Sequence, residues 1–373
     1  MLTSDFDYDL PEERIAQEPF EPRDMCKMMV LGRKSGQIEH RIFRDIVEYI
    51  EPGDLLVVNE TRVMPARLLG RKAETGGAAE VLLLRQRRPD MGDGYAEWDA
   101  MVKPGKRLKP GAKVEFFSQF DECATDGGAG DCDGNDPAPV LTATILDWRE
   151  GAAPGERVVG IQSHVGTLDE AIHQVGKAPL PPYIHGYKGD PEMYQTVYSR
   201  RESSAAAPTA GLHFTPELLE QLKAKGVGLA TVELEIGLGT FRAVTTERAE
   251  DHDMHSEVYH VSPETVEVVQ AAKARGGRVV AVGTTSMRSL ESAWSEEAGS
   301  IVPRDGESTR LFILPGYEFH VVDALATNFH VPKSTLMMLV SAFSTRENIM
   351  RAYAEAVEQE YRMLSFGDAM LII

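Results

Sequence analysis

Apolar and polar positions divide the chain into stretches of different character. An apolar run within residues 54–58 follows Pro52-Gly53 and predicts a buried strand. From about residue 66 to 160, short β-like runs alternate with turn residues, and no segment there predicts a convincing helix. Their regular spacing predicts a small antiparallel β-barrel. The runs are Glu80–Leu84, Trp98–Val102, Lys113–Phe117, Val140–Ile145 and Arg157–Ile161.

Beyond about residue 165 the pattern changes to an alternation of helices and strands, which indicates a sheet covered by helices. Helices are predicted over Leu168–Val175 and Pro216–Lys225, from Ser262-Pro263 to Gly276-Gly277, and from about Ser286; strands are predicted over Leu229–Ile236 and Arg278–Val282. We therefore expect an α/β main domain, residues 1–65 and 161–373, with a small antiparallel β-barrel domain inserted at 66–160.

One segment of the predicted barrel is rich in glycine and aspartate and poor in apolar residues, so we expect a mobile loop at 119–138. Cys123 and Cys132 lie in it with no histidine nearby, which argues against a metal site there. An odd number of cysteines, three in all, fits a reducing cytoplasm. The acidic N-terminus does not read as a signal peptide, and no apolar run is long enough to span a bilayer.

The net charge of −19 argues at first against a nucleic-acid partner. The cations, however, gather in residues 62–113, and Lys103 to Lys113 contains five of them and no carboxylate. This segment is either a solvated basic face or a contact for an RNA backbone. The candidates for such a contact are Arg62, Arg67, Lys103, Lys106, Arg107 and Lys109.

Two loops, far apart in the sequence, combine small or apolar residues with a histidine. The first, Ala205–Phe214, contains Pro208, Thr209, Gly211 and His213 and precedes a helix with Thr215 as its predicted N-cap. The second, Thr327–Thr335, contains Asn328, His330 and Lys333. Each is either a tightly packed loop or a ligand-binding segment. Their shared character predicts that they form two walls of one pocket.

Two further segments carry candidate chemistry. In Gly283–Arg288 a buried strand meets a helix start, where free N–H groups, Thr284, Thr285 and Arg288 offer either an anion cradle or an ordinary capped helix. The segment His252–Glu257, with His260 nearby, suits acid/base work through His255, and zinc ligation is the alternative.

Three other features leave alternatives open. Lys333 suits a Schiff base less well than it suits a cation that positions substrate, because no pyridoxal-type context accompanies it. Glu233 and Glu235 alternate onto one face of a strand, where they lie near a cationic ligand or face solvent. Gly237-Leu-Gly239 is a weak dinucleotide signal, because it lacks a third glycine and a following helix.

The chain resembles, nearly end to end, the S-adenosylmethionine:tRNA ribosyltransferase-isomerase family of queuosine biosynthesis. Two departures from the family pattern are visible: Ser203 stands where a glycine is expected, and Cys26-Lys27 stands where the pattern reads Ser-Arg. The matching segments are Phe6–Pro11, Gly53–Arg62, Tyr194–Tyr198, Ala206–Phe214, Met254–Glu257, Gly283–Ser286, Thr327–His330 and Pro332–Thr335.

The resemblance implies a two-domain plan and transfer of the ribosyl part of S-adenosylmethionine to 7-aminomethyl-7-deazaguanine in tRNA, giving epoxyqueuosine, adenine and methionine. Such a reaction needs at least two acid/base groups, and no metal or cofactor beyond S-adenosylmethionine as co-substrate. We expect a cytoplasmic monomer with no membrane partner. The catalytic candidates are His213, His255 and His330; the substrate-binding candidates are Pro208, Thr209, Gly211, Glu233, Glu235, Gly283, Thr284, Thr285, Arg288, Asn328 and Lys333.

Two other classes of function compete with this one. A methyltransferase would also use S-adenosylmethionine, but the glycine-rich loop after a first strand is missing. A non-catalytic RNA-binding module would need only the basic insert, and it gives no reason for two histidine-bearing loops.

Overall fold

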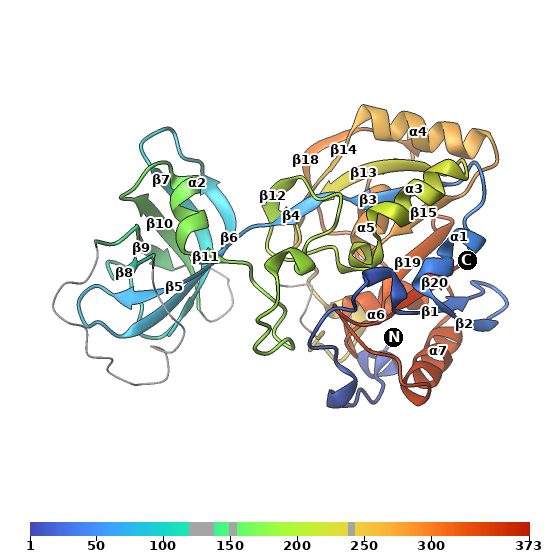
Figure 1. Ribbon diagram of the computed structural model, residues 1–373, viewed down its shortest axis with the longest axis horizontal. Coiled ribbons are helices and arrows are strands. Elements are labelled where there is room, and N and C mark those ends of the chain that lie inside the picture. Colours follow the sequence, from blue (N-terminus) through green and yellow to red (C-terminus); the bar gives the residue numbers. More distant parts are fainter. Residues whose placement is uncertain (119–137, 149–154, 238–242) are drawn as a thin grey trace. The chain divides into compact units, whose positions relative to one another are not determined.

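A computed structural model describes residues 1–118, 138–148, 155–237 and 243–373. The loop expected at 119–138, with Cys123 and Cys132, lies outside these ranges except for its last residue. The chain divides into two compact units: unit 1 comprises residues 1–62 and 180–373, and unit 2 comprises residues 63–179 (Figure 1).

Unit 1 is built on a mixed sheet whose centre consists of parallel strands. Strand β3 pairs in parallel with β13 and β15, and β15 pairs in parallel with β19. Strand β20 is antiparallel to β19 and parallel to β1. In order across the sheet the strands are β18 (Arg304–Thr309), β14 (Glu257–Val261), β13 (Gly228–Leu234), β3 (Leu55–Asn59), β15 (Val279–Val282), β19 (Ala324–Asn328), β20 (Ala369–Ile372), β1 (Lys27–Leu31) and β2 (Ile38–Ile42).

Strands β3, β15, β19 and β20 are buried at every position and mostly apolar, because both faces of the sheet are covered. On strand β3, Leu55 and Val57 join one core cluster, whereas Leu56 and Val58 join the other. The first cluster is completed by α4 (Pro263–Ala274), α5 (Thr284–Ser292), α6 (Thr335–Phe343) and α7 (Arg346–Glu358), and the second by α1 (Ile46–Tyr49) and α3 (Pro216–Ala224). Smaller two-stranded pairs are β4 (Thr61–Val63) with β12 (Arg201–Ser204), and β16 (Trp294–Ser295) with β17 (Ser300–Ile301).

Helix starts follow the capping rules that the sequence predicts. Thr215 Oγ1 accepts the N–H of Leu218 at 3.2 Å, and Ser262 Oγ accepts the N–H of Thr265 at 3.1 Å. The helix expected from about Ser286 begins at Thr284, after Gly283 with φ +87°. Only glycine adopts that backbone conformation without strain, so Gly283 allows β15 to turn directly into α5.

Unit 2 contains a closed antiparallel barrel, so the predicted fold class is confirmed. Its strands follow the order β5 (Arg67–Lys72), β6 (Ala78–Arg88), β7 (Tyr95–Lys103), β10 (Glu156–Ser163), β9 (Leu141–Trp148) and β8 (Lys113–Phe116). Pairing of β8 with β5 closes the cylinder, which removes both sheet edges. The sequence pattern did not predict β5.

The end of unit 2 differs from the bound expected at residue 160. Helix α2 (Leu168–Val175) packs on the barrel strands β5, β9 and β10, and β11 (Gly176–Lys177) pairs with β5. These contacts extend unit 2 to Pro179. Among the described residues, no helix has both the length and the apolar character needed to cross a membrane.

Candidate active site

The two histidine-bearing loops and the start of α5 line one cavity in unit 1, here called the first cavity. It encloses about 420 Å³, part of it open to solvent. The cavity is lined by Ala207, Pro208, Thr209, Ala210, Ile236, Gly283, Thr284, Thr285, Thr327, Asn328, His330 and Leu336. Of the predicted substrate-binding residues, the structure thus brings six together here with His330.

Sheet topology brings these segments together. Strands β15 and β19 are parallel neighbours, so Gly283 and Asn328 both lie at their carboxyl ends, and the Gly283 N–H donates to Ala326 O at 2.8 Å. Ligand sites in sheets of this kind form at such carboxyl ends. The other wall is the 3-10 helix η7 (Thr209–His213). Its Gly211 packs on Tyr198, where a Cβ would come within 2.0 Å of Oη, so Gly211 permits close packing and does not line the cavity.

The N-terminus of α5 gives the first cavity an anion-binding wall. Its first helical bond runs from the Met287 N–H to Gly283 O, and no side chain caps the helix start. The N–H groups of Thr284 and Thr285 therefore have no acceptor within the helix. Thr285 Oγ1 is buried and bonds no other described group. The positive end of the helix dipole and free donors favour a carboxylate or phosphate at this point.

His213 is buried behind Asn328, and its tautomer follows from its partners. Asn328 Oδ1 accepts the Thr209 hydroxyl at 3.0 Å, and Nδ2 donates to Leu364 O at 3.3 Å. Nδ2 also donates to His213 Nε2 at 3.0 Å, which makes Nε2 the acceptor. The ring proton of a neutral His213 is then on Nδ1, 3.2 Å from Cys26 Sγ. Cys26, a departure from the family pattern, thus contacts a predicted catalytic histidine.

His330 lines the first cavity with both ring nitrogens engaged. The Tyr353 hydroxyl accepts the His330 main-chain N–H at 3.0 Å and lies 3.1 Å from Nδ1. The Tyr353 hydroxyl has one proton, so it donates a hydrogen bond to His330 Nδ1. The other ring nitrogen of His330, Nε2, is then protonated and donates to Thr327 Oγ1 at 3.1 Å. Tyr8 completes the support by donating to His330 O at 2.7 Å.

Both buried histidines are neutral at physiological pH. Burial lowers the pKa of His330 to about 3. Burial, with a smaller contribution from the Arg23 and Arg362 charges, lowers the pKa of His213 to about 3. Neither ring carries an imidazolium proton to give at the start of a reaction. The unprotonated nitrogen of each ring already accepts a hydrogen bond, from Asn328 or from Tyr353, and must give it up before it takes a proton from a substrate.

Arg288 does not line the first cavity; it forms a buried ion pair with Glu257. Glu257 Oε1 also bonds His255 Nε2 at 3.1 Å and accepts the Gly237 N–H at 3.3 Å. Burial raises the pKa of Glu257, but the Arg288 charge and the His255 hydrogen bond outweigh burial and lower it overall. This network adjoins Ile236 and α5 but does not line the first cavity.

The remaining substrate-binding candidates also lie outside the first cavity, in surface ion pairs. Arg201 bridges the carboxylates of Glu233 (3.1 Å) and Glu235 (3.0 Å), which share one face as the alternation predicts. Lys333 Nζ lies 2.7 Å from Asp7 Oδ2. Among the described residues, no group of three or more His, Cys, Asp or Glu side chains is placed to hold a metal ion.

The predicted RNA-binding cations fall into two groups. Arg62 pairs with Glu192 and Glu202, while Arg67 and Lys103 both lie within 4 Å of Glu80 carboxylate oxygens. Lys106, Arg107 and Lys109 are exposed in the turn between β7 and β8, and none of the described carboxylates forms an ion pair with them.

Comparison with known proteins agrees over the full length of the chain. A family model described as a queuosine biosynthesis protein matches residues 3–372. The chain belongs to this family. Its relatives include S-adenosylmethionine:tRNA ribosyltransferase-isomerases from Symbiobacterium thermophilum (52% identical) and Desulforamulus reducens (47% identical), each aligned over all of both chains. The structure also resembles S-adenosylmethionine tRNA ribosyltransferase from Thermotoga maritima, with a TM-score of 0.52 and 39% identity over 99% of this chain and 100% of that chain.

The predicted resemblance to the ribosyltransferase-isomerase family is therefore confirmed, and the chain is an enzyme of that family. Sequence reasoning missed several groups that support its site. Thr327 lies in the matching segment Thr327–His330 but was not predicted as a site residue, although its hydroxyl contacts His330 at the wall of the first cavity. Tyr8 lies in the matching segment Phe6–Pro11 and was not predicted either. Tyr353 gave no signal, because a buried tyrosine on an amphipathic helix reads as core.

Proposed function

We propose that this chain uses the first cavity to transfer and isomerise the ribosyl moiety of S-adenosylmethionine onto 7-aminomethyl-7-deazaguanine in tRNA. The products are epoxyqueuosine-tRNA, adenine and methionine. One observation carries the placement of this reaction: the α5 N-terminus, the Thr209 loop and the Asn328–His330 loop converge on one cavity lined with unpaired donors.

The methionine carboxylate is the part of S-adenosylmethionine that fits the start of α5. The N–H groups of Thr284 and Thr285 and the orphaned Thr285 Oγ1 are donors, and the helix dipole adds a favourable field. The apolar side chains of Ala207, Pro208 and Ile236 line part of the same cavity and reduce the amount of water around a bound sulfonium. An unshielded sulfonium acidifies the adjacent C5′ protons of the ribose, as the first step requires.

The reaction breaks the bonds of the ribosyl group to adenine and to sulfur, together with its ring C1′–O bond. It forms a C1′ bond to the aminomethyl nitrogen, a C1′–C5′ bond that closes the five-carbon ring, and a C5′–O bond that completes the epoxide. The C5′ carbon and the attacking amine each lose a proton, while departing adenine gains one. His330 and His213 are our candidates for accepting protons, since both are neutral. His255, oriented by Glu257, is the candidate for a further proton transfer.

Unit 2 supplies the tRNA contact in this proposal. Lys106, Arg107 and Lys109 are exposed on an otherwise acidic protein, so they attract phosphates locally while the net charge of −19 discourages indiscriminate RNA binding. We further propose that the enzyme works as a cytoplasmic monomer and needs no cofactor beyond S-adenosylmethionine as co-substrate.

Product analysis tests the reaction. Incubated with S-adenosylmethionine and tRNA carrying 7-aminomethyl-7-deazaguanine, the protein should release adenine and methionine without added metal. Formation of S-adenosylhomocysteine would instead show methyl transfer. Loss of activity on chelation, restored by zinc, would contradict the absence of a metal cofactor.

A further inference from the structure

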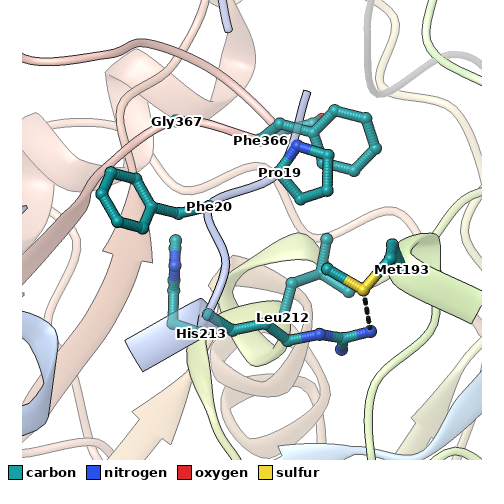
Figure 2. A pocket seen from close by; sticks show the side chains of 9 residues that line it. Pro19, Phe20, Met193, Leu212, His213, Phe366 and Gly367 are labelled. Atoms are coloured by element: carbon teal, nitrogen blue, oxygen red, sulfur yellow. Dashed lines mark hydrogen bonds between the residues drawn. The ribbon is translucent and has the colours of Figure 1, made fainter. Parts of the chain in front are cut away.

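A second cavity lies in unit 1 on the other side of His213. Its walls come from the N-terminal segment (Pro19, Phe20), from Leu212 of η7 and from the segment before β20 (Phe366), with Met193 opposite (Figure 2). It encloses about 260 Å³. Part of this volume is open to solvent, so a ligand can enter the cavity from the surface.

Flat groups form much of the wall. Phe366 is buried, whereas Phe20 is 39% exposed at the rim. Arg23 presents a guanidinium whose orientation is fixed by the main chain: Nη1 donates to Gln195 O at 2.7 Å, and Nη2 donates to Glu192 O at 2.8 Å. Nη2 also contacts Met193 Sδ, the dashed line in Figure 2. Aromatic rings and guanidinium planes are the surfaces on which proteins stack nucleobases.

The lining disfavours a phosphate. Arg23 is the one cation among the described residues that line the second cavity, and both of its terminal nitrogens already donate to main-chain oxygens. Anion sites present free donors, as the α5 start does in the first cavity. The second cavity instead offers stacking planes, with the His213 ring and Ser365 as polar edges.

Two hydrogen-bonded side chains separate the two cavities. His213 lines the second cavity and Asn328 lines the first, and Asn328 Nδ2 lies 3.0 Å from His213 Nε2. A ring held in one cavity is therefore two side chains away from a group held in the other. A reaction that joins parts of two substrates needs adjoining sites of this kind.

We propose that the second cavity binds a planar purine-type ring during the ribosyl transfer. This inference rests on the proposed function. Two rings of that chemistry take part in the reaction: the 7-deazapurine of the tRNA, extruded from its stack, and the adenine of S-adenosylmethionine. Enzymes that act on a base extrude it into a pocket with stacking walls, at a cost that the pocket offsets.

The test uses Phe20→Ala, which removes a rim ring that is partly exposed, and Phe366→Leu, which removes a buried one. Phe20→Trp restores a ring, and Val268→Ala on α4 is a matched change at an exposed apolar side chain elsewhere. Equilibrium binding is measured for S-adenosylmethionine, for free adenine, for free 7-aminomethyl-7-deazaguanine, and for tRNA with and without the modified base. Melting temperatures correct for the folded fraction.

Loss of a stacked ring should weaken binding by roughly tenfold, since base–aromatic stacking contributes about 1–3 kcal/mol. Weaker binding of adenine and S-adenosylmethionine assigns the cavity to adenine. Weaker binding of the free deazapurine, with lost discrimination between the two tRNAs, assigns it to the tRNA base. Phe20→Trp should restore the binding of the ligand that Phe20→Ala weakens.

If folded Phe20→Ala and Phe366→Leu bind all five ligands within about twofold of the parent, the inference is wrong. That result would leave the product analysis of the parent enzyme untouched, so failure of the proposed reaction and failure of the second cavity are distinguishable.

Discussion

Asn328 donates a hydrogen bond to Nε2 of His213 at 3.0 Å, although 115 positions separate the two residues in sequence. The bond joins the two loops that the sequence predicts to form one pocket. It also makes His213 an acceptor on the side facing Asn328, so any role in proton transfer begins from the neutral ring.

His213→Ala and His330→Ala should each lower turnover by on the order of 10²–10⁴, because removal of a positioned base has an effect of that size. Each loss also unpairs buried partners, Asn328 in one case and Tyr353 in the other, which costs about 1–3 kcal/mol of stability. Turnover and melting temperature are measured on the same samples. A variant that melts early but keeps near-normal turnover per folded molecule would make that histidine structural.

Thr285→Val should raise the KM for S-adenosylmethionine by about five- to tenfold with a much smaller effect on kcat, because in the proposed site the hydroxyl contacts the carboxylate, far from the reacting carbon. One hydrogen bond to a charged group contributes about 1.5–3 kcal/mol, part of which the helix N–H groups retain. Thr285→Ser keeps the hydroxyl and should behave as the parent does. Equal KM values for all three proteins would remove the α5 start from the substrate site.

Glu257→Gln should destabilise unit 1 by about 3–5 kcal/mol, because it leaves the buried Arg288 guanidinium without a counter-charge. The matched change Glu233→Gln affects a surface pair with Arg201, so its cost should stay below about 1 kcal/mol. Urea unfolding monitored by circular dichroism measures both. Similar midpoints for the two variants would contradict the assignment of Glu257–Arg288 as a buried structural pair.

Replacing Lys106, Arg107 and Lys109 together with glutamine should weaken tRNA binding and flatten its salt dependence, since fewer counterions are released. Binding of S-adenosylmethionine should not change. Lys223→Gln, at an exposed lysine of α3, controls for the loss of surface charge. Unaltered tRNA affinity at several salt concentrations would identify these cations as a solvated surface.

Acidification should destabilise the protein through His213 and His330. Their pKa values fall from an ordinary 6.5 to about 3 on folding, so the unfolded chain binds more protons between these limits. The contribution of the two neutral rings to the free energy of unfolding is fully present above pH 6.5. It is lost as the pH falls toward 3, by up to about 1.4 kcal/mol per pH unit for each ring.

The dependence of stability on pH is followed through unfolding midpoints measured from pH 7.5 to 5. This interval lies above the pH range in which carboxylates titrate. His330→Gln should make the slope shallower, because it removes a group whose pKa is lowered on folding. A His330→Gln slope as steep as that of the parent would contradict a buried neutral ring at this position.

Local chemistry determined much of this protein from sequence alone. Period-2 runs and turns predicted the barrel strands, and Thr215-Pro216 and Ser262-Pro263 marked helix starts, because capping and strand alternation depend on neighbouring residues. The two motif loops and the Gly283 turn predicted the walls of the first cavity, since small residues and free N–H groups at a helix start are local features.

Only the tertiary structure decided which charged side chains are free. Arg288, one turn into α5, reads as an anion ligand in sequence, yet the strand β14 brings Glu257 to it. Tyr353 and Cys26 meet His330 and His213 across separations of 23 and 187 residues. Such pairings depend on which strands become neighbours in the sheet, and the large free energy of burying a charge or an imidazole then selects the partner.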